Sequence, residues 1–201
     1  MLFQYASTAH VRRHGPTGYL NYQSFKPWLR DEFTFRCVYC LARETWYPNG
    51  ADGFGVDHQK PTTRHPELEC EYANLLYACN RCNSWKQHKN LIDPTRTGFE
   101  QHLRVRRDGV IEGLTTDGVF FIKVLELDQD EQVAFRKKTM DLYEALDGIP
   151  EGAELLKEFF GYPRDMPDLE SLRAPGGNTR PAGAASSFYN RAAAGQLADW
   201  Y

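Results

Sequence analysis

Apolar side chains recur at helical spacing in three stretches of the chain. Residues 25–35, 128–147 and 151–160 each carry apolar residues three or four positions apart. This spacing matches the period of an α-helix and predicts an amphipathic helix in each stretch. The third stretch is followed by Gly161 and Pro163, two residues that commonly end a helix.

Shorter apolar pieces predict strands between the first two helical stretches. Residues 55–58 and 74–78 have strand-like composition, and residues 80–90 look helical. Further along, Asp108-Gly109 is typical of a tight hairpin turn. These patterns predict an α+β fold in which the strands and most helices occupy separate parts of the chain.

The remaining stretches have a different character. Residues 174–187 are rich in Gly, Ala, Pro and Ser, a composition typical of a linker. The last dozen or so residues suit a short docking helix, with apolar Phe188, Tyr189, Leu197, Trp200 and Tyr201. The expected organisation has four segments. They are an N-terminal extension (1–36), a central core (37–107), an acidic hairpin and helical extension (108–171), and a flexible linker with a C-terminal tail (172–201).

Length and composition narrow the class of protein. With 201 residues, the chain suits one domain, or one domain and an appendage. Its apolar runs, such as residues 119–122, are too short to cross a bilayer. Residues 1–14 lack the apolar centre of an export signal, so we expect a cytoplasmic protein without a membrane partner. An odd number of cysteines, five, then argues against a disulfide framework.

The charge is divided unevenly along the chain. The formal net charge of -3 at first argues against a nucleic-acid partner, because proteins that bind nucleic acids are usually basic. Residues 57–107, however, carry nine basic and six acidic residues, whereas residues 108–171 carry six basic and sixteen acidic ones. The net charge therefore hides a mildly basic centre and one acidic block, and it does not exclude nucleic acid.

Four of the cysteines form two C-x2-C pairs. Cys37 and Cys40 make the first pair, and Cys79 and Cys82 make the second. A two-residue gap lets a tight turn aim both thiolates at one ion, and two such pairs complete a tetrahedral structural zinc site. One pair alone could be a redox motif or a coincidence, but two favour zinc. The fifth cysteine, Cys70, suits a small buried hydrophobe.

A second group of polar residues lies within and just beyond the cysteine pairs. Asp57 and Asn83 offer hard oxygen atoms of the kind that Mg²⁺ or Mn²⁺ prefers. His58 can take a proton from water near neutral pH. Asn74 can hydrogen-bond an imidazole or a backbone group, although an Asn before a strand can also simply cap a turn. Because neighbouring strand residues point to opposite faces, Asp57 and His58 would need a bend or bulge to serve one site.

Residues 37–89 resemble the HNH endonuclease family, in the subgroup whose small ββα-metal core is clamped by a four-cysteine zinc site. The family pattern is a cysteine pair, Asp-His with a proline shortly after, Asn-Leu, and a second cysteine pair followed by His or Asn and then Lys. In this chain the elements are Cys37 and Cys40, Asp57-His58 with Pro61, Asn74-Leu75, and Cys79 and Cys82 with Asn83 and Lys86. The resemblance covers about a quarter of the chain in detail.

The resemblance implies a role for each matched residue. His58 matches the general base, Asp57 and Asn83 the ligands of one Mg²⁺ or Mn²⁺, and Asn74 the residue that orients the base. Lys86 matches a residue near the active-site phosphate. Asn83 stands where many relatives have His, but Asn is a common family variant and keeps a hard ligand.

The resemblance also implies substrates and partners. DNA is the family default, and the sequence does not exclude RNA. Four basic residues near the candidate site are expected to contact phosphates, although they also suit an ordinary solvated face: Lys60, Arg64, Arg81 and Lys89.

Three functions fit these observations. The first is an active metal-dependent endonuclease, and the second is a catalytically silent zinc-dependent module that binds nucleic acid or scaffolds a larger complex. The third is a nuclease effector of a bacterial anti-phage defence system, activated or targeted by a protein partner. The chain carries no G-x4-G-K-[ST] motif and no separate sequence-reading module, which suits an effector subunit.

Overall fold

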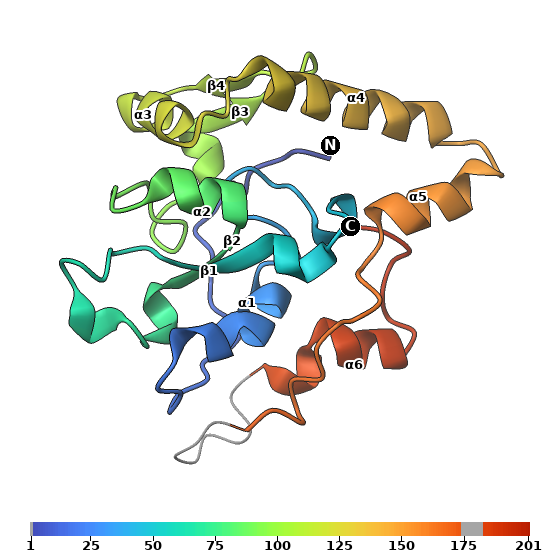
Figure 1. Ribbon diagram of the computed structural model, residues 1–201. Coiled ribbons are helices and arrows are strands. Elements are labelled where there is room, and N and C mark those ends of the chain that lie inside the picture. Colours follow the sequence, from blue (N-terminus) through green and yellow to red (C-terminus); the bar gives the residue numbers. More distant parts are fainter. Residues whose placement is uncertain (1, 174–182) are drawn as a thin grey trace. The chain divides into compact units, whose positions relative to one another are not determined.

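The computed structural model describes residues 2–173 and 183–201 (Figure 1). Its α-helices are α1 (Lys26–Glu32), α2 (Asn80–Lys86), α3 (Thr116–Leu125), α4 (Asp130–Leu146), α5 (Gly152–Phe160) and α6 (Phe188–Ala193). Its strands are β1 (Phe54–His58), β2 (Leu75–Cys79), β3 (Leu103–Val105) and β4 (Ile111–Gly113). Short 3-10 helices are η1 (Tyr22–Phe25), η2 (Glu44–Trp46), η3 (Gly50–Gly53), η4 (Pro66–Leu68), η5 (Tyr72–Asn74), η6 (Phe99–Gln101) and η7 (Ala184–Ser186). No helix within the described ranges is long and apolar enough to cross a membrane.

The chain divides into two compact units, each made of segments that are distant in the sequence. One unit combines Met1–Val11 with Ser84–Phe159, and the other combines Arg12–Asn83 with Phe160–Tyr201. The boundary falls inside α2. The second unit contains all four paired cysteines and is called the cysteine unit below.

The cysteine unit is built on an antiparallel ribbon of two strands. β1 and β2 pair from Phe54 opposite Cys79 to His58 opposite Leu75, and α2 starts directly after β2 (Figure 1). The two strands lie within one residue of the predicted stretches, so those predictions are confirmed. The mixed α and β composition is also confirmed, and strands and helix follow one another in the order ββα.

Aromatic packing fills the core around this ribbon. Phe54 of β1 stacks on Tyr77 of β2 with ring centroids 5.3 Å apart. The helix predicted over 25–35 is confirmed as η1 followed by α1, and it buries Trp28 and Leu29. α1 contacts both β1 and β2, so the apolar side chains of the helix pack against the ribbon.

The C-terminal segment belongs to the same unit. α6 is capped by Ser187, whose side chain accepts a hydrogen bond from the Asn190 N–H, and the Phe188 N–H donates to buried Asp31 at 2.7 Å. The docking helix predicted for the last dozen or so residues, including Phe188 and Tyr189, therefore covers only the first part of that stretch and ends at Ala193.

Residues 194–201 form no helix, and their last residue is held by side-chain contacts instead. Tyr201 lies under the Arg43 guanidinium, which is 4.1 Å from its ring centroid. Residues 174–182 of the predicted linker lie outside the described part of the chain, and η7 occupies 184–186.

The other unit contains the predicted hairpin. It also contains α4 and nearly all of α5, the helices predicted over residues 128–147 and 151–160. β3 and β4 pair antiparallel from Leu103 opposite Gly113 to Val105 opposite Ile111. Gly109 adopts a φ of 86° in the turn, a conformation that favours glycine. Arg136 of α4 donates to the Gly109 carbonyl at 2.6 Å, so the helix fixes the turn.

The α-helix α3 was not expected from the sequence. α3 forms over Thr116–Leu125, where the apolar run of residues 119–122 contains residues that favour strands. Thr115 caps the helix by accepting a hydrogen bond from the Gly118 N–H at 3.1 Å. The helix buries Phe121 and leaves Phe120 exposed, so the cap and one-sided burial outweigh the local strand preference.

Candidate metal centres and catalytic residues

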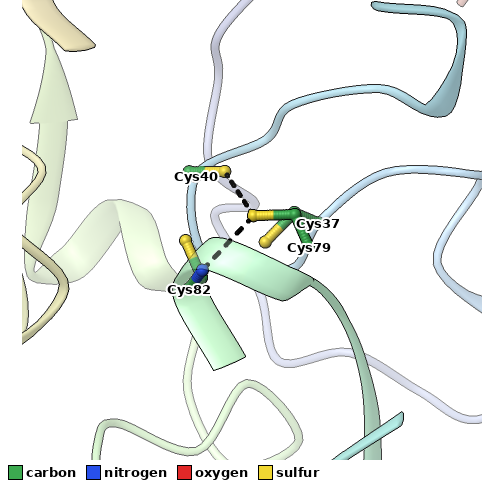
Figure 2. Close-up of side chains that lie close together, drawn as sticks. All are labelled: Cys37, Cys40, Cys79 and Cys82. Carbon is green, nitrogen blue, oxygen red and sulfur yellow. Dashed lines mark hydrogen bonds between the residues drawn. The ribbon is translucent and has the colours of Figure 1, made fainter. Parts of the chain in front are cut away.

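The four paired cysteines converge in the cysteine unit. Cys37 and Cys40 lie on the loop that follows α1, Cys79 ends β2, and Cys82 lies in the first turn of α2 (Figure 2). All four are buried, and their sulfur atoms lie within 4.8 Å of one another. The two pairs are far apart in sequence, and they meet because the loop with the first pair is hydrogen-bonded to β2, from the Val38 N–H to Tyr77 O.

The spacing of the sulfur atoms fits a metal ion. Tetrahedral zinc with Zn–S bonds of about 2.3 Å places its sulfurs about 3.8 Å apart. Cys40 Sγ and Cys79 Sγ are 3.7 Å apart, a separation too long for a disulfide bond (Figure 2). The Cys82 N–H also points at Cys79 Sγ, 3.5 Å away, as expected for an amide supporting a thiolate ligand. The four cysteines together could therefore bind zinc as its complete set of ligands.

The thiols influence one another strongly. Hydrogen bonds from the other three cysteines hold the pKa of Cys79 well below its usual value. Burial raises the pKa of Cys37 well above its usual value, and hydrogen bonding to its neighbours contributes to the rise. A cluster that shares protons in this way must release them when a cation binds, because the thiolate is the metal ligand.

The loop that carries the first pair is tied to the ribbon. The Cys37 N–H donates to Ala42 O at 2.8 Å, and the Leu41 N–H returns to Cys37 O at 3.0 Å. The Val38 N–H donates to Tyr77 O of β2, also at 3.0 Å. These backbone bonds fix the loop between Cys37 and Cys40, called the zinc loop below, against the ribbon.

Asp57 lies in β1 and is only 5% exposed. Its Oδ2 accepts a hydrogen bond from the Tyr39 hydroxyl, which belongs to the zinc loop. Burial, followed by the nearby Asp57 carboxylate, raises the pKa of Tyr39 well above its usual value, so the phenol stays protonated and donates. A buried carboxylate needs such partners, because burial penalises its charge.

Asn83 lies on the same face of the ribbon as Asp57. A Cβ atom on Gly55 would lie 3.7 Å from Asn83 Nδ2, and Gly55 and Asp57 share a face because they are two residues apart in β1. The Asn83 amide nitrogen donates to Val56 O at 3.3 Å. This bond orients the amide and turns its oxygen, a suitable ligand for a hard cation, away from that carbonyl.

His58 is the last residue of β1. Its Nε2 lies 3.0 Å from Glu69 O, and its ring meets that of Tyr22 edge-on with centroids 4.8 Å apart. Because a carbonyl oxygen can only accept, Nε2 must carry the proton of this bond. In the neutral imidazole the basic lone pair is therefore on Nδ1.

The pairing of β1 with β2 runs without a bulge from Phe54 to His58. Strand alternation therefore directs Asp57 and His58 to opposite faces of the ribbon. A bulge in β1 therefore does not turn Asp57 and His58 to one face.

Asn74 contacts the loop that joins the two strands. Its Oδ1 accepts from the Lys60 N–H at 2.8 Å, and its Nδ2 donates to Lys60 O at 3.1 Å and Leu68 O at 3.3 Å. Leu68 directly precedes Glu69, whose carbonyl holds the His58 ring. Asn74 thus fixes the backbone on which the position of His58 depends.

The basic candidates are distributed unevenly. Lys60 and Arg64 are exposed on the loop between the strands, and Arg81 is half-buried in α2. Lys86 and Lys89 belong to the other unit, where Lys86 is fully buried and Lys89 is exposed. Lys60, Arg64 and Lys89 can therefore be ordinary solvent-exposed residues, whereas Lys86 cannot.

Tyr39 and the Glu69 carbonyl were not recognised from the sequence. Tyr39 lies between two cysteines, and no spacing rule connects it with Asp57, eighteen residues away. The Glu69 carbonyl is a backbone group, and side-chain motifs carry no signal for it.

The comparisons with known proteins give a limited result. No family model matches the chain. The Septu protein PtuB of Bacillus thuringiensis is 27% identical over 133 residues, which cover 60% of this chain and 49% of that protein. The chain therefore spans about half the length of the curated relative it matches, and it is a distant homologue of a Septu protein.

Proposed function

We propose that this protein is a metal-dependent endonuclease of the HNH type that hydrolyses phosphodiester bonds in DNA. The observation that carries the proposal is the position of Asp57, His58 and Asn83 on a β1–β2–α2 unit closed by four cysteines. Asp57 and Asn83 share one face, and a backbone carbonyl holds the His58 ring.

In this proposal His58 is the general base. Its Nε2–H is engaged with Glu69 O, so Nδ1 takes the proton from a water molecule. The water oxygen forms a bond to phosphorus while the bond from phosphorus to the leaving oxygen breaks. The proton from water stays on Nδ1 until solvent removes it, and the leaving oxygen is protonated from solvent.

Asp57 and Asn83 would hold one Mg²⁺ or Mn²⁺. Both provide the hard oxygen atoms that these ions prefer, and the burial of Asp57 fits a site that receives a cation. When bound, the ion supplies Lewis-acid stabilisation of negative charge on the phosphate and the leaving oxygen.

The remaining candidates position the substrate and the base. Asn74 holds the loop that orients His58. Lys86 is fully buried, and it is proposed to act near the phosphate because it matches the Lys of the HNH family pattern. Lys60, Arg64, Arg81 and Lys89 are proposed to contact backbone phosphates, which gives binding that depends on salt but not on sequence. The zinc site keeps this arrangement folded.

We further propose that the nuclease acts in anti-phage defence with a protein partner. The distant homology to a Septu protein is consistent with a defence-system role. We expect a chain with an acidic block and a net charge of -3 to bind DNA weakly by itself, which suits an effector that a partner brings to its substrate.

The proposal is tested with zinc-loaded protein, supercoiled plasmid and Mg²⁺ or Mn²⁺. We expect wild-type protein to nick the plasmid and EDTA to stop the reaction. His58→Ala is expected to lower the rate by about 100-fold or more, the scale of a lost general base. Asn83→Ala is expected to lower the rate as well, because the ion loses a ligand. Parallel incubations with linear DNA, single-stranded DNA and RNA identify the substrate.

His88→Ala is the matched control, because His88 is an exposed histidine just after α2. It is expected to cut like the wild type. Equal rates for wild type, His58→Ala and Asn83→Ala would contradict the proposed roles. A complete lack of metal-dependent cleavage by wild-type protein, with and without its partner, would favour a catalytically silent binding module.

A further inference from the structure

The zinc loop and the proposed catalytic metal site are joined by a side-chain hydrogen bond. Tyr39 lies between the ligands Cys37 and Cys40, and its hydroxyl donates to Oδ2 of Asp57. Tyr39 is fully buried, and Asp57 is 5% exposed, so solvent competes little for this bond.

The anchoring of Tyr39 makes the bond a positional restraint. Cys37 and Cys40 flank Tyr39 on both sides in the zinc loop, and the Val38 N–H holds the loop to Tyr77 O of β2 at 3.0 Å. Asp57 lies on the other strand of the ribbon, opposite Leu76. The Tyr39 hydroxyl therefore links a loop fixed on β2 to a carboxylate on β1.

A carboxylate can accept this bond and still bind a metal ion. Two carboxylate oxygens offer about four acceptor positions, and the Tyr39 bond uses one of them. A fixed neighbour that donates to a ligating carboxylate sets its rotamer, so less freedom is lost when the ion binds.

We propose that Tyr39 is a positioning residue that orients Asp57 for Mg²⁺ or Mn²⁺ and so couples the zinc loop to the catalytic metal site. The inference rests on the proposed function, because it takes Asp57 as a metal ligand. It adds that zinc binding preorganises the second site through one phenol hydroxyl.

The test measures Mn²⁺ binding to zinc-loaded protein by the electron paramagnetic resonance signal of free Mn²⁺, without nucleic acid. Tyr39→Phe removes only the hydroxyl and is expected to raise the Kd for Mn²⁺ by about 10- to 100-fold. Zinc content is expected to stay at the wild-type level. An unchanged Kd would overturn the inference, and loss of zinc would do so as well, because Tyr39 would then support the zinc loop itself.

Tyr77→Phe is the matched control. Tyr77 is also buried in the cysteine unit and donates its hydroxyl to a carboxylate, that of Glu44, at 2.6 Å. It is expected to leave the Kd for Mn²⁺ unchanged. An equal rise in Kd in both variants would mean that any lost buried hydroxyl weakens the site, which contradicts a specific role for Tyr39.

A second variant separates action through Asp57 from a general effect on the fold. Asp57→Ala, which leaves no side-chain oxygen for Tyr39 or the ion, is expected to weaken Mn²⁺ binding, and adding Tyr39→Phe to it is expected to produce no further loss. A further loss equal to that in the wild-type background would contradict the inference. Wild-type protein that binds Mn²⁺ through Asp57 but cuts no nucleic acid would contradict only the proposed nuclease, whereas protein that binds no Mn²⁺ would contradict both.

Discussion

Buried charged side chains hold the cysteine unit together at the level of single residues. Arg30 of α1 makes two hydrogen bonds to Glu44, at 3.0 and 2.8 Å, and Tyr77 donates to the same carboxylate. Burial alone lowers the pKa of Arg30, but hydrogen bonds and charge from Glu44 outweigh it and raise the pKa above its usual value. The arginine is therefore charged in the folded protein, and Glu44 depends on it as a partner.

Replacing Arg30 by methionine tests this dependence. Arg30→Met keeps much of the apolar volume but leaves Glu44 buried beside Tyr77 without its cation. We expect the free energy of unfolding to fall by about 3 kcal/mol or more, as when one partner of a buried ion pair is removed. Urea denaturation followed by circular dichroism measures the change.

Arg64→Met is the control for this experiment, because Arg64 is an exposed arginine of the same unit. Its effect is expected to stay within about 0.5 kcal/mol. Similar losses in the two variants would show that the Arg30–Glu44 pair adds nothing specific to stability.

The β1–β2 ribbon depends on the zinc loop at the level of secondary structure. Two strands alone are marginally stable in water. The four cysteines brace this ribbon, because Cys79 ends β2, Cys82 lies in α2, and the zinc loop is hydrogen-bonded to β2. Four buried cysteines of this spacing gain stability when they bind zinc, because the unfolded chain offers no comparable site.

Loss of zinc is therefore expected to open the ribbon. Removing zinc with a strong chelator should increase hydrogen exchange over β1 and β2, measured by mass spectrometry, while the β3–β4 hairpin keeps its protection. Cys40→Ser should lower bound zinc and the midpoint of thermal unfolding. Cys70→Ser is the control, since Cys70 lies outside the cluster, and should retain zinc. Full protection of β1 and β2 in metal-free protein would contradict a stabilising role for zinc.

The distribution of charge matters at the level of the whole molecule. Residues 108–171 carry sixteen acidic and six basic residues, while residues 57–107, which contain the candidate catalytic residues, carry an excess of three positive charges. A nucleic acid that approaches the protein is attracted by one segment and repelled by the other, and salt screens both effects.

Neutralising part of the acidic block is expected to strengthen binding to DNA. Three exposed glutamates lie just before or within α5: Glu151, Glu154 and Glu158. Changing all three to Gln raises the formal net charge from -3 to zero. Affinity for a random DNA duplex should rise several-fold at about 50 mM salt and converge with the wild type near 0.5 M, where the Debye length is short. Fluorescence anisotropy measures both, and equal affinity at low salt would identify the block as an ordinary solvated surface.

Features that depend on local pattern could be predicted from the sequence. Helical spacing located α1, α4 and α5, and the Asp108-Gly109 dipeptide located the turn of the second hairpin. The two C-x2-C pairs predicted a shared metal site because their spacing reflects the geometry of the ligands, and the structure brings all four sulfurs together.

Contacts between distant residues were decided only by the tertiary structure. α3 forms where local preference favours a strand, because burial of Phe121 rewards the helix. The bonds from Tyr39 to Asp57 and from His58 to the Glu69 carbonyl depend on how the zinc loop and the β1–β2 loop fold back on the ribbon. Residue types at fixed spacing therefore defined which groups were available for chemistry, whereas the packing of the chain decided which of them hold one another in place.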